Sequence, residues 1–548
     1  MVRRLPLLLF LWAPFIAAAQ APASDTTAAA IGRLFADWIT TETPGCAVGV
    51  GRSGKTLYER GFGLANLETN TPVTPATIFQ AASIAKQFTA MSIMLLVRDG
   101  KLSLDDDIRK FIPELPDYGS RITIRNLLTH TSGLRDFFEM LILARGRFEE
   151  DRITEADMLD IVTRQKKLNF VPGEEYLYSN TGFALLEVIV KRASGKSLRD
   201  FAAERIFTPL GMSNTQFRDD YTALVRGRAE GYGRRGSAWY SRTPNYDVYG
   251  STNLFTTTGD LLIWSRNLDN PRVGDTSMVR QMSTSAVLAN GEATNYGFGL
   301  SLWNDRGTPV VEHEGGDPGF RSYLGRYPQY GLAVVVLCNI PSNPVALGHS
   351  IASLYIDKPA AKASASSAKA RIAAEVLTSH AGVYFRPQTL EVVEITLRDG
   401  ELFTARQGGM RLQPIDENRF VADNQPLEIN FASGVKAGYT ALIPGRQPIH
   451  FERKTPFSPG SAELAEYSGE YYSDELGSLY RVTVADSTLV FKTGTANGIV
   501  ARPVFADGFV RGQLTIQFTR NAGAVTGFEI SHPRARRLTF RRVDSSGR

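Results

Sequence analysis

The 548-residue chain contains only two cysteines, Cys46 and Cys338, and its six histidines are scattered. Two isolated thiols cannot form a structural zinc site, and no cluster of histidines predicts a metal or a cofactor. The sequence also has no G-x-S-x-G segment, which disfavours the α/β-hydrolase class of serine enzymes. These absences predict a protein that works without a metal or a cofactor.

Long basic runs and long apolar runs are equally scarce. The 61 basic and 56 acidic residues give a net charge of +5, with both signs mixed along the chain. No basic run is interleaved with aromatic residues, so we expect no nucleic-acid partner. After residue 20, no segment is long and apolar enough to span a membrane.

Residues 1–20 have the pattern of a secretory signal peptide. Arg3 and Arg4 form a basic start, a short apolar stretch runs from Leu5 to Ala18, and small residues stand at its end. We therefore expect an exported protein, in the periplasm or secreted. An uncleaved membrane anchor is the alternative.

Composition divides the rest of the chain into domains. With 43% hydrophobic and 21% charged residues, the sequence is that of a globular protein. Residues 358–373 are rich in Ala, Ser and Lys, a composition that cannot bury a core and predicts a linker. We predict a catalytic domain at residues 26–357 and two further domains at residues 374–455 and 462–543.

The last two domains are copies of one unit. Pro414 and Phe420 recur as Pro503 and Phe509, and other matches keep the same spacing of ~88 residues, which marks a duplication. Each copy alternates apolar and polar residues over short runs separated by turn residues, which indicates antiparallel strands. We expect a small barrel or sandwich in each copy.

The first domain begins and ends with strands and has helices between them. Residues 46–51 and 57–63 predict a hairpin, residues 83–97 a helix, and three strand-like runs follow at 309–313, 320–327 and 332–339. This order predicts one antiparallel sheet packed on helices, with the first strand beside the last. Cys46 and Cys338 would then meet, so a disulfide is a hypothesis, with two buried free thiols as the alternative.

Ser83 and Lys86 are the first candidate catalytic residues. Positions three apart lie on one helix face, so the amine of Lys86 can reach the hydroxyl of Ser83. A serine hydroxyl needs an adjacent base, and a desolvated lysine can serve as one. The alternative is a chance pattern with Ser83 as a helix cap; a second S-x-x-K match, Ser366 to Lys369, lies in the linker.

Tyr178 and Asn180 follow in a polar loop before an apolar run at residues 183–190. A tyrosine there could relay protons, and an asparagine could hold a substrate amide. The alternative is that Tyr178 is a core aromatic residue and Asn180 caps a helix.

His313, Glu314, Gly315 and Gly316 stand at the end of a strand, before a turn. The glycines would let a substrate backbone lie along the strand, and the amide of Gly316, with that of Ser83, could form an oxyanion hole. The alternative for His313 is an ordinary surface histidine.

The three elements, in this order and spacing, resemble the active-site motifs of the serine β-lactamase and DD-peptidase superfamily. The Tyr-x-Asn form is similar to class C β-lactamases and their esterase and D-aminopeptidase relatives. Residues 100–105, GKLSLD, and 122–134, ITIRNLLTHTSGL, also resemble signature segments of this family. The repeated units resemble the two C-terminal barrels of three-domain D-aminopeptidases.

The resemblance implies a fold and a set of roles. The fold is an α+β β-lactamase-like domain, an antiparallel sheet flanked by helices, followed by two small antiparallel β-barrel, lipocalin-like domains. Ser83 would form an acyl-enzyme, Lys86 and Tyr178 would share the acid and base work, and Asn180 would orient the substrate. The amides of Ser83 and Gly316 would hold the oxyanion.

The third motif departs from the family pattern, which is Lys-Thr-Gly or Lys-Ser-Gly. His313 is largely neutral at pH 7, and Glu314, if it faces the site, would repel a substrate carboxylate and attract an amine. The alternative is that Glu314 points away, because neighbours on a strand alternate. The departure favours an ester or a peptide with a free amino end.

We therefore expect a serine hydrolase that acts on an amide or ester, with D-amino-acid peptides as the first choice of substrate. A β-lactamase or DD-carboxypeptidase is the alternative within this class. A non-catalytic ligand-binding protein is the alternative from another class. The substrate is a small molecule or peptide, and the oligomeric state cannot be read from the sequence.

Overall fold

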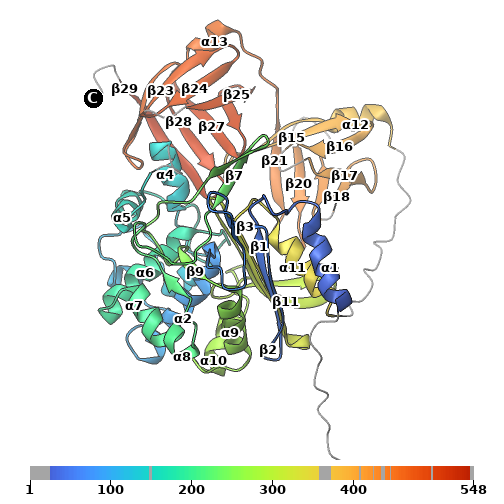
Figure 1. The fold of residues 1–548 in the computed structure, drawn as a ribbon. Helices are drawn as coiled ribbons and strands as arrows, with labels where there is room; N and C mark the ends of the chain where they lie inside the picture. Colours follow the sequence, from blue (N-terminus) through green and yellow to red (C-terminus); the bar gives the residue numbers. More distant parts are fainter. Residues whose placement is uncertain are drawn as a thin grey trace, which may run out of the picture.

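The computed structural model describes residues 25–146, 151–356, 372–405, 409–423, 425–432, 438–444, 446–494 and 498–543. The signal peptide expected at residues 1–20, nearly all of the expected linker and the second S-x-x-K match lie outside these residues. Figure 1 shows an α+β domain in blue to yellow, with two barrels, in orange and red, side by side on one end of it. The predicted fold class is confirmed.

The first domain is built on one six-stranded antiparallel sheet. Its strand order is β10-β11-β12-β13-β1-β2, so the first strand pairs with the last, as predicted. The strands are β1 (Cys46–Arg52), β2 (Lys55–Phe62), β10 (Ser301–Asp305), β11 (Thr308–Asp317), β12 (Phe320–Tyr327) and β13 (Leu332–Cys338). The edge strand β10 was not predicted, because its side chains are half exposed and show no clear alternation.

Helices cover both faces of this sheet. On one face, α1 (Asp25–Ala36) and α11 (Pro344–Ala352) share a buried apolar cluster with β1 and β13. On the other face, α9 (Thr258–Asp269) packs against the same two strands. The burial of β1 and β13 on both faces explains their continuous apolar sequences.

The hypothesised bond between Cys46 and Cys338 is present. The two residues lie directly opposite each other in the β1–β13 pair, and their sulfur atoms form a disulfide. It joins residues 292 positions apart in the sequence, so it closes nearly the whole first domain into one loop.

The helical region lies beside the sheet. The helix expected at residues 83–97 begins with a 3₁₀ turn, Ala82–Ile84, and continues as α2 (Ala85–Arg98), which is buried along most of its length. The apolar run at 183–190 is the centre of α6 (Asn180–Ser194). The other helices are α3 (Ile124–Leu128), α4 (Phe137–Arg145), α5 (Glu155–Thr163), α7 (Leu198–Ala202), α8 (Thr208–Leu210) and α10 (Thr276–Met282), with a π-helical turn at Ala203–Phe207 and 3₁₀ turns at Ile108–Lys110 and Pro328–Tyr330. Short strands are β3 (Leu64–Asn66), β4 (Thr71–Pro72), β5 (Phe79–Gln80), β6 (Gln216–Phe217), β7 (Tyr232–Arg235), β8 (Ala238–Ser241) and β9 (Leu254–Thr256).

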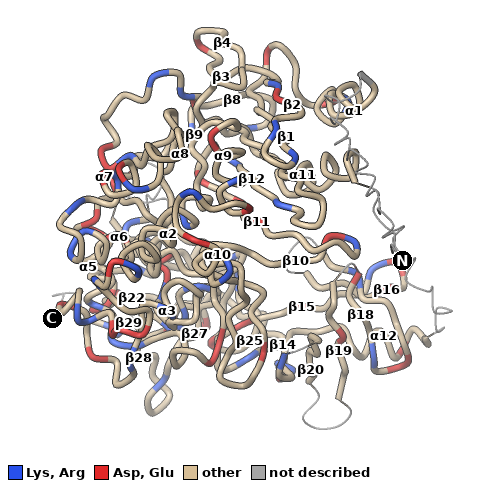
Figure 2. Tube along the Cα trace, turned by 90° about the horizontal axis from the view of Figure 1, so that it is seen from below, with Lys and Arg blue, Asp and Glu red and all other residues tan. Residues whose placement is uncertain are grey.

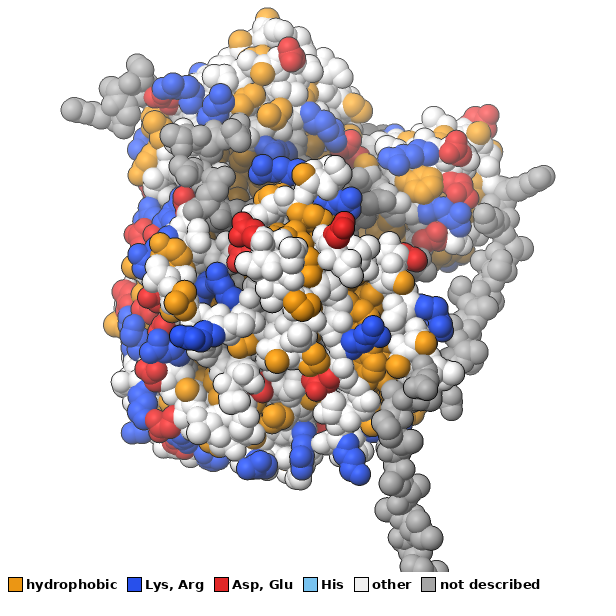
Figure 3. Space-filling model, viewed as in Figure 1, with side chains coloured by type: hydrophobic (Ala, Val, Ile, Leu, Met, Phe, Trp, Pro, Cys, Tyr) orange, Lys and Arg blue, Asp and Glu red, His pale blue; other side chains and the backbone are white. Residues whose placement is uncertain are grey.

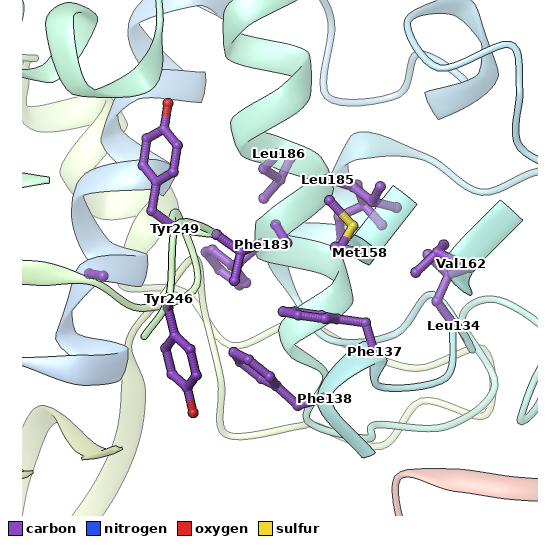
Figure 4. Close-up of a cluster of buried hydrophobic side chains, with 14 of the residues drawn as sticks. Leu134, Phe137, Phe138, Met158, Val162, Phe183, Leu185, Leu186, Tyr246 and Tyr249 are labelled. Carbon is purple, nitrogen blue, oxygen red and sulfur yellow. The ribbon is translucent and has the colours of Figure 1, made fainter. Parts of the chain in front are cut away.

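Aromatic packing fixes α4 against α6. Figure 4 shows Phe137 and Phe138 at the start of α4, where Phe138 faces Tyr246. Phe183, on the neighbouring α6, belongs to the same cluster. The rings of Phe138 and Tyr246 have centroids 5.2 Å apart. Since both helices begin beside the loop that carries Tyr178, this cluster holds the helix N-termini close together.

The two C-terminal domains are closed eight-stranded antiparallel barrels, each preceded by a short helix. The first follows α12 (Ala374–His380) and has β14 (Gly382–Arg386), β15 (Glu391–Arg398), β16 (Glu401–Thr404), β17 (Arg411–Pro414), β18 (Arg419–Ala422), β19 (Glu428–Phe431), β20 (Gly438–Leu442) and β21 (Ile449–Lys454). The second follows α13 (Ser461–Ala465) and has β22 (Gly469–Ser473), β23 (Ser478–Ala485), β24 (Thr488–Lys492), β25 (Ile499–Phe505), β26 (Gly508–Arg511), β27 (Leu514–Asn521), β28 (Ala524–His532) and β29 (Ala535–Val543).

Equivalent contacts recur in the two barrels, as expected for a duplication. Pro414 pairs with Phe420 in the first barrel, and Pro503 pairs with Phe509 in the second. The Tyr384 hydroxyl donates to the His380 carbonyl at 2.8 Å, and the Tyr471 hydroxyl donates to the Tyr467 carbonyl at the same distance. The sequence repeat therefore corresponds to a repeated pattern of hydrogen bonds and strand pairs.

The second barrel is docked on the first domain through a buried ion pair. Arg135 donates to Glu475 at 2.6 Å, and the two side chains are 1% and 7% exposed. Arg135 also donates to the carbonyl of Arg536 on β29 at 2.9 Å. Because Arg135 directly precedes the Asp136 cap of α4, the barrel contacts a segment that leads into the helical core.

The surface carries charges of both signs. Basic and acidic residues are interspersed along the Cα trace in Figure 2, and on the face shown in Figure 3 charged side chains are dispersed among uncharged groups. Within the described ranges, no helix is long and apolar enough to cross a bilayer.

Candidate active site

Ser83 and Lys86 are brought together at the start of α2. The Nζ atom of Lys86 lies 3.0 Å from the Oγ of Ser83. Lys86 is completely buried, and its amine also lies 2.9 Å from the Oδ1 of Asn180 and 2.7 Å from the carbonyl of Ser251. These three partners account for the hydrogen-bonding capacity of the amine.

The amine of Lys86 can act as a base near neutral pH. Burial lowers the pKa of Lys86 to about 7, against the opposing influence of Asp136 and Asp317. A neutral amine has two N–H donors and one lone pair. Asn180 Oδ1 and the Ser251 carbonyl can only accept, so the lone pair is left for the hydroxyl proton of Ser83.

Tyr178 lies beside the pair formed by Ser83 and Lys86. Its ring is 4.8 Å from the amine of Lys86, measured to the ring centroid. Burial raises the pKa of Tyr178 far above its usual value, and a hydrogen bond with Ser83 opposes this rise only in part. The phenol therefore keeps its proton, so Tyr178 can donate a proton while Lys86 accepts one.

Asn180 is held by Asp136, a residue that the sequence analysis did not single out. One carboxylate oxygen of Asp136 accepts from the backbone N–H of Asn180 at 2.7 Å and from its side-chain amide at 3.0 Å. The other oxygen caps α4 by accepting from the N–H of Phe138. The amide N–H₂ is thus bound to Asp136, which leaves its oxygen to face Lys86.

Gly315 lets β11 approach the turn that carries Ser83. A Cβ at position 315 would lie 2.2 Å from the Oγ of Ser322 and 2.5 Å from the carbonyl of Ala81. Ser322 also donates to that carbonyl at 2.7 Å. Ala82, next to the nucleophile, has a φ of 46°, a left-handed value that costs a residue with a Cβ about 1–2 kcal/mol.

Gly316 differs from Gly315, because a Cβ there would meet only the guanidinium of Arg321 at 3.6 Å. Gly315 is therefore needed for close packing of β11 against Ala81 and Ser322, whereas Gly316 has space for a Cβ on the side of the cleft.

His313 is 3% exposed, and both of its ring nitrogens are bonded within the protein. Nδ1 lies 2.6 Å from the carbonyl of Glu314, and Nε2 lies 2.9 Å from the hydroxyl of Tyr296. Glu314 is exposed at its surface, but partial desolvation and the charge of Glu312, two positions before it on β11, raise its pKa, and Arg321 opposes this rise. Glu314 nonetheless lines the rim of the cleft.

A cavity of about 690 Å³ contains all the predicted site residues except the buried Lys86. Its other lining side chains include Phe138, Ile142, Tyr246, Trp303 and Arg321. Among the described residues, no group of histidines, cysteines or carboxylates is arranged to hold a metal ion.

The second barrel contributes Arg534 to this cavity, from the turn between β28 and β29. Its guanidinium pairs with Glu139 and lies 3.8 Å from the carboxylate of Asp136. Its carbonyl accepts from the N–H of Asp136 at 2.9 Å. The barrel therefore shapes the electrostatics of the site directly.

Three residues of the site were not predicted from the sequence, each for a different reason. Asp136 could have been found, since an aspartate before the apolar run of α4 is a helix-cap signal. Ser251 acts through its carbonyl, which no residue type reveals. Arg534 lies about 450 residues from Ser83 in the sequence, and only the docking of the barrel brings it to the site.

Comparisons with known proteins show the family to which the chain belongs. The family model described as Beta-lactamase matches residues 28–354. The chain belongs to the Beta-lactamase family. It is a serine hydrolase of that family, and the resemblance stated from its motifs is confirmed.

Two relatives and one solved structure show how far the likeness extends. Penicillin-binding protein 4* of Bacillus subtilis is 28% identical over 417 residues, which cover 71% of this chain and 90% of that protein. A D-aminopeptidase of Gluconobacter oxydans is 25% identical over 541 residues, covering 91% and 96%. The octameric penicillin-binding protein homologue from Pyrococcus abyssi has the same fold, with a TM-score of 0.56 and 24% identity, covering 78% of this chain and 99% of that one.

Proposed function

We propose that this Beta-lactamase family member is an exported hydrolase of amides, and that its substrates are peptides or amides with a D-amino acid at a free amino end. Ser83 is the nucleophile, Lys86 the base and Tyr178 the acid. The observation that carries this assignment is the buried Lys86 amine, 3.0 Å from the Ser83 hydroxyl and with a pKa of about 7.

In the proposed mechanism, the Oγ of Ser83 attacks the substrate carbonyl and its proton passes to Nζ of Lys86. The amides of Ser83 and Gly316 stabilise the oxyanion. The phenol of Tyr178 gives its proton to the leaving nitrogen as the carbon–nitrogen bond breaks, and Lys86 returns a proton to the phenol. Water then attacks the acyl-enzyme, and the proton transfers run in reverse to restore Ser83.

The choice of substrate rests on two observations. The D-aminopeptidase relative matches 91% of this chain, including the region of the barrels. The rim of the cleft carries the exposed carboxylate of Glu314, which attracts an amine and repels a carboxylate. An ester with the same acyl group would react by the same steps, so esterase activity is part of the proposal.

Export is supported by the leader-like residues 1–20. The Cys46–Cys338 disulfide agrees with it, because such bonds persist in oxidising compartments.

A substrate panel tests the proposal. It comprises D- and L-amino-acid p-nitroanilides, short-chain p-nitrophenyl esters, a peptide ending in D-Ala-D-Ala and a chromogenic cephalosporin. We expect release of p-nitroaniline from the D-amino-acid compounds, lost in Ser83→Ala. Preferential cleavage of the cephalosporin or of the D-Ala-D-Ala peptide would replace the proposal with a β-lactamase or a DD-carboxypeptidase.

A further inference from the structure

Tyr296 is a buried tyrosine that the proposed mechanism does not use. It is 2% exposed, and its hydroxyl lies 2.9 Å from the Nε2 of His313. Its ring contacts the rings of His130, Tyr176 and Tyr178, with centroids 4.7, 5.8 and 6.3 Å away. It is thus part of an aromatic bed beneath Tyr178.

The hydrogen bonds of His313 define its tautomer. A carbonyl oxygen can only accept, so the 2.6 Å contact to the Glu314 carbonyl requires the proton on Nδ1. In the neutral ring, Nε2 is then an acceptor, and the hydroxyl of Tyr296 must be its donor. Burial raises the pKa of Tyr296 well above its usual value, so this donor keeps its proton.

The surroundings of His313 disfavour its cation. The titratable groups that face it are Lys86, the phenols of Tyr178 and Tyr296, and His130. None of these groups carries a negative charge that would stabilise a positively charged ring. Burial and the charge of Lys86 together lower the pKa of His313 to about 3.

We propose that Tyr296 is a positioning residue: its hydroxyl donates to Nε2 and, with the Glu314 carbonyl that fixes the proton on Nδ1, holds His313 as the neutral Nδ1–H tautomer, so that β11 presents neither a charge nor a free ring N–H to the substrate. The substrate group beside His313 is then an uncharged one, such as the amide of a longer peptide, and a carboxylate at that place is disfavoured. The selectivity rests on the proposed hydrolase function, whereas the tautomer does not.

The tautomer is tested on the full-length protein labelled with ¹⁵N-histidine. Long-range ¹H–¹⁵N correlation spectra report which ring nitrogen carries the proton, and His313→Gln identifies the signals of this ring. We expect the Nδ1–H form from pH 5 to 9. In Tyr296→Phe, Nε2 loses the donor that stabilises the neutral ring, so we expect the pKa of His313 to rise toward this range. Tyr323→Phe is the matched control, because its hydroxyl, on the paired strand β12, donates to Glu312 of β11 and not to His313.

The selectivity is tested with two peptides that start with the same D-amino acid and differ only in a C-terminal carboxylate or carboxamide. In Tyr296→Phe at pH 5.5, we expect kcat/KM for the carboxylate peptide, relative to the carboxamide, to rise at least threefold over wild type, and to return toward the wild-type ratio at pH 8. Tyr323→Phe should keep the wild-type ratio throughout.

A protonated Nε2 or a cationic His313 in the wild-type protein at pH 7 would overturn the inference, and this spectrum stands even if Tyr296→Phe fails to fold. An unchanged pKa of His313 and an unchanged ratio in a folded Tyr296→Phe would also overturn it. Absence of hydrolysis of both peptides by the wild type, with the predicted tautomer observed, would refute the proposed substrate class alone.

Discussion

Asp136 binds Asn180 through a single carboxylate oxygen, which accepts from both the backbone N–H and the side-chain amide of that residue. The same carboxylate caps α4 through its second oxygen. One buried side chain therefore joins the start of α4 to the start of α6. It also fixes which end of the Asn180 amide faces Lys86.

Asp136→Asn is expected to impair this arrangement. An amide has one acceptor oxygen, so either a buried donor of Asn180 or the α4 cap loses its partner, at about 1–3 kcal/mol. If the loss falls on the site, kcat/KM drops by roughly 5- to 150-fold. Steady-state kinetics measure the effect. Asp275→Asn makes the same change at the capping aspartate of α10, which does not line the cavity and has a single donor to satisfy, so it should retain wild-type kcat/KM.

Gly315→Ala and Gly316→Ala should differ sharply. The new methyl at 315 would overlap Ser322 and the Ala81 carbonyl, and overpacking of this kind costs about 1–3 kcal/mol. We expect a lower free energy of unfolding and loss of activity, because the turn that carries Ser83 must shift. Gly316→Ala should unfold at the wild-type denaturant concentration. Equal stability of the two variants would contradict the packing role of Gly315.

The pairing of Ser83 with Lys86 was predictable because the two residues are close together in the sequence. The spacing of Ser83 and Lys86 places both on one helix face whatever the rest of the chain does. The hairpin at residues 46–63 and the duplication marked by Pro414 and Phe420 also followed from local patterns, whereas the edge strand β10 did not.

The remainder of the site depends on contacts between distant segments. The interaction of Tyr296 with His313 requires that an irregular segment before β10 pack beneath β11, and the Arg534 contact requires a docked barrel. Neither segment has a periodicity or a motif that reveals its neighbour. From the sequence, His313 was placed at the site without any partner for its ring nitrogens, whereas in the structure both nitrogens are bonded within the protein.

Arg534→Ala should shift the pH dependence of catalysis upward. The Arg534 charge lowers the pKa of Lys86, while Asp136 raises it, so removing the guanidinium leaves the amine protonated to a higher pH. The acidic limb of the kcat/KM profile should move to higher pH. Arg520→Ala removes the same charge from the same barrel, but from ion pairs with Glu466 and Asp507, and should leave the limb in place. A limb that moves downward in Arg534→Ala would contradict the stated electrostatics.

Loss of the disulfide should weaken the fold without altering the chemistry. The bond joins strands whose cysteines belong to the apolar cluster beneath α1 and α11, on the sheet face opposite α9. In the double variant Cys46→Ser, Cys338→Ser, the free energy of unfolding should fall by about 2–5 kcal/mol. Thermal denaturation measures the change, and a reductant should lower the Tm of the wild type only. A reductant-insensitive wild type would show that the bond does not form.

The central claim is that the neutral amine of Lys86 activates the hydroxyl of Ser83. It is tested most directly by the rate of labelling with a fluorophosphonate probe between pH 5 and 9, with the adduct located by mass spectrometry. The account predicts an adduct on Ser83 and a rate that rises to half its maximum at about pH 7, with both lost in Ser83→Ala and the pH-dependent rise lost in Lys86→Ala. A rate that does not change across this range, or an adduct on another residue, would contradict it.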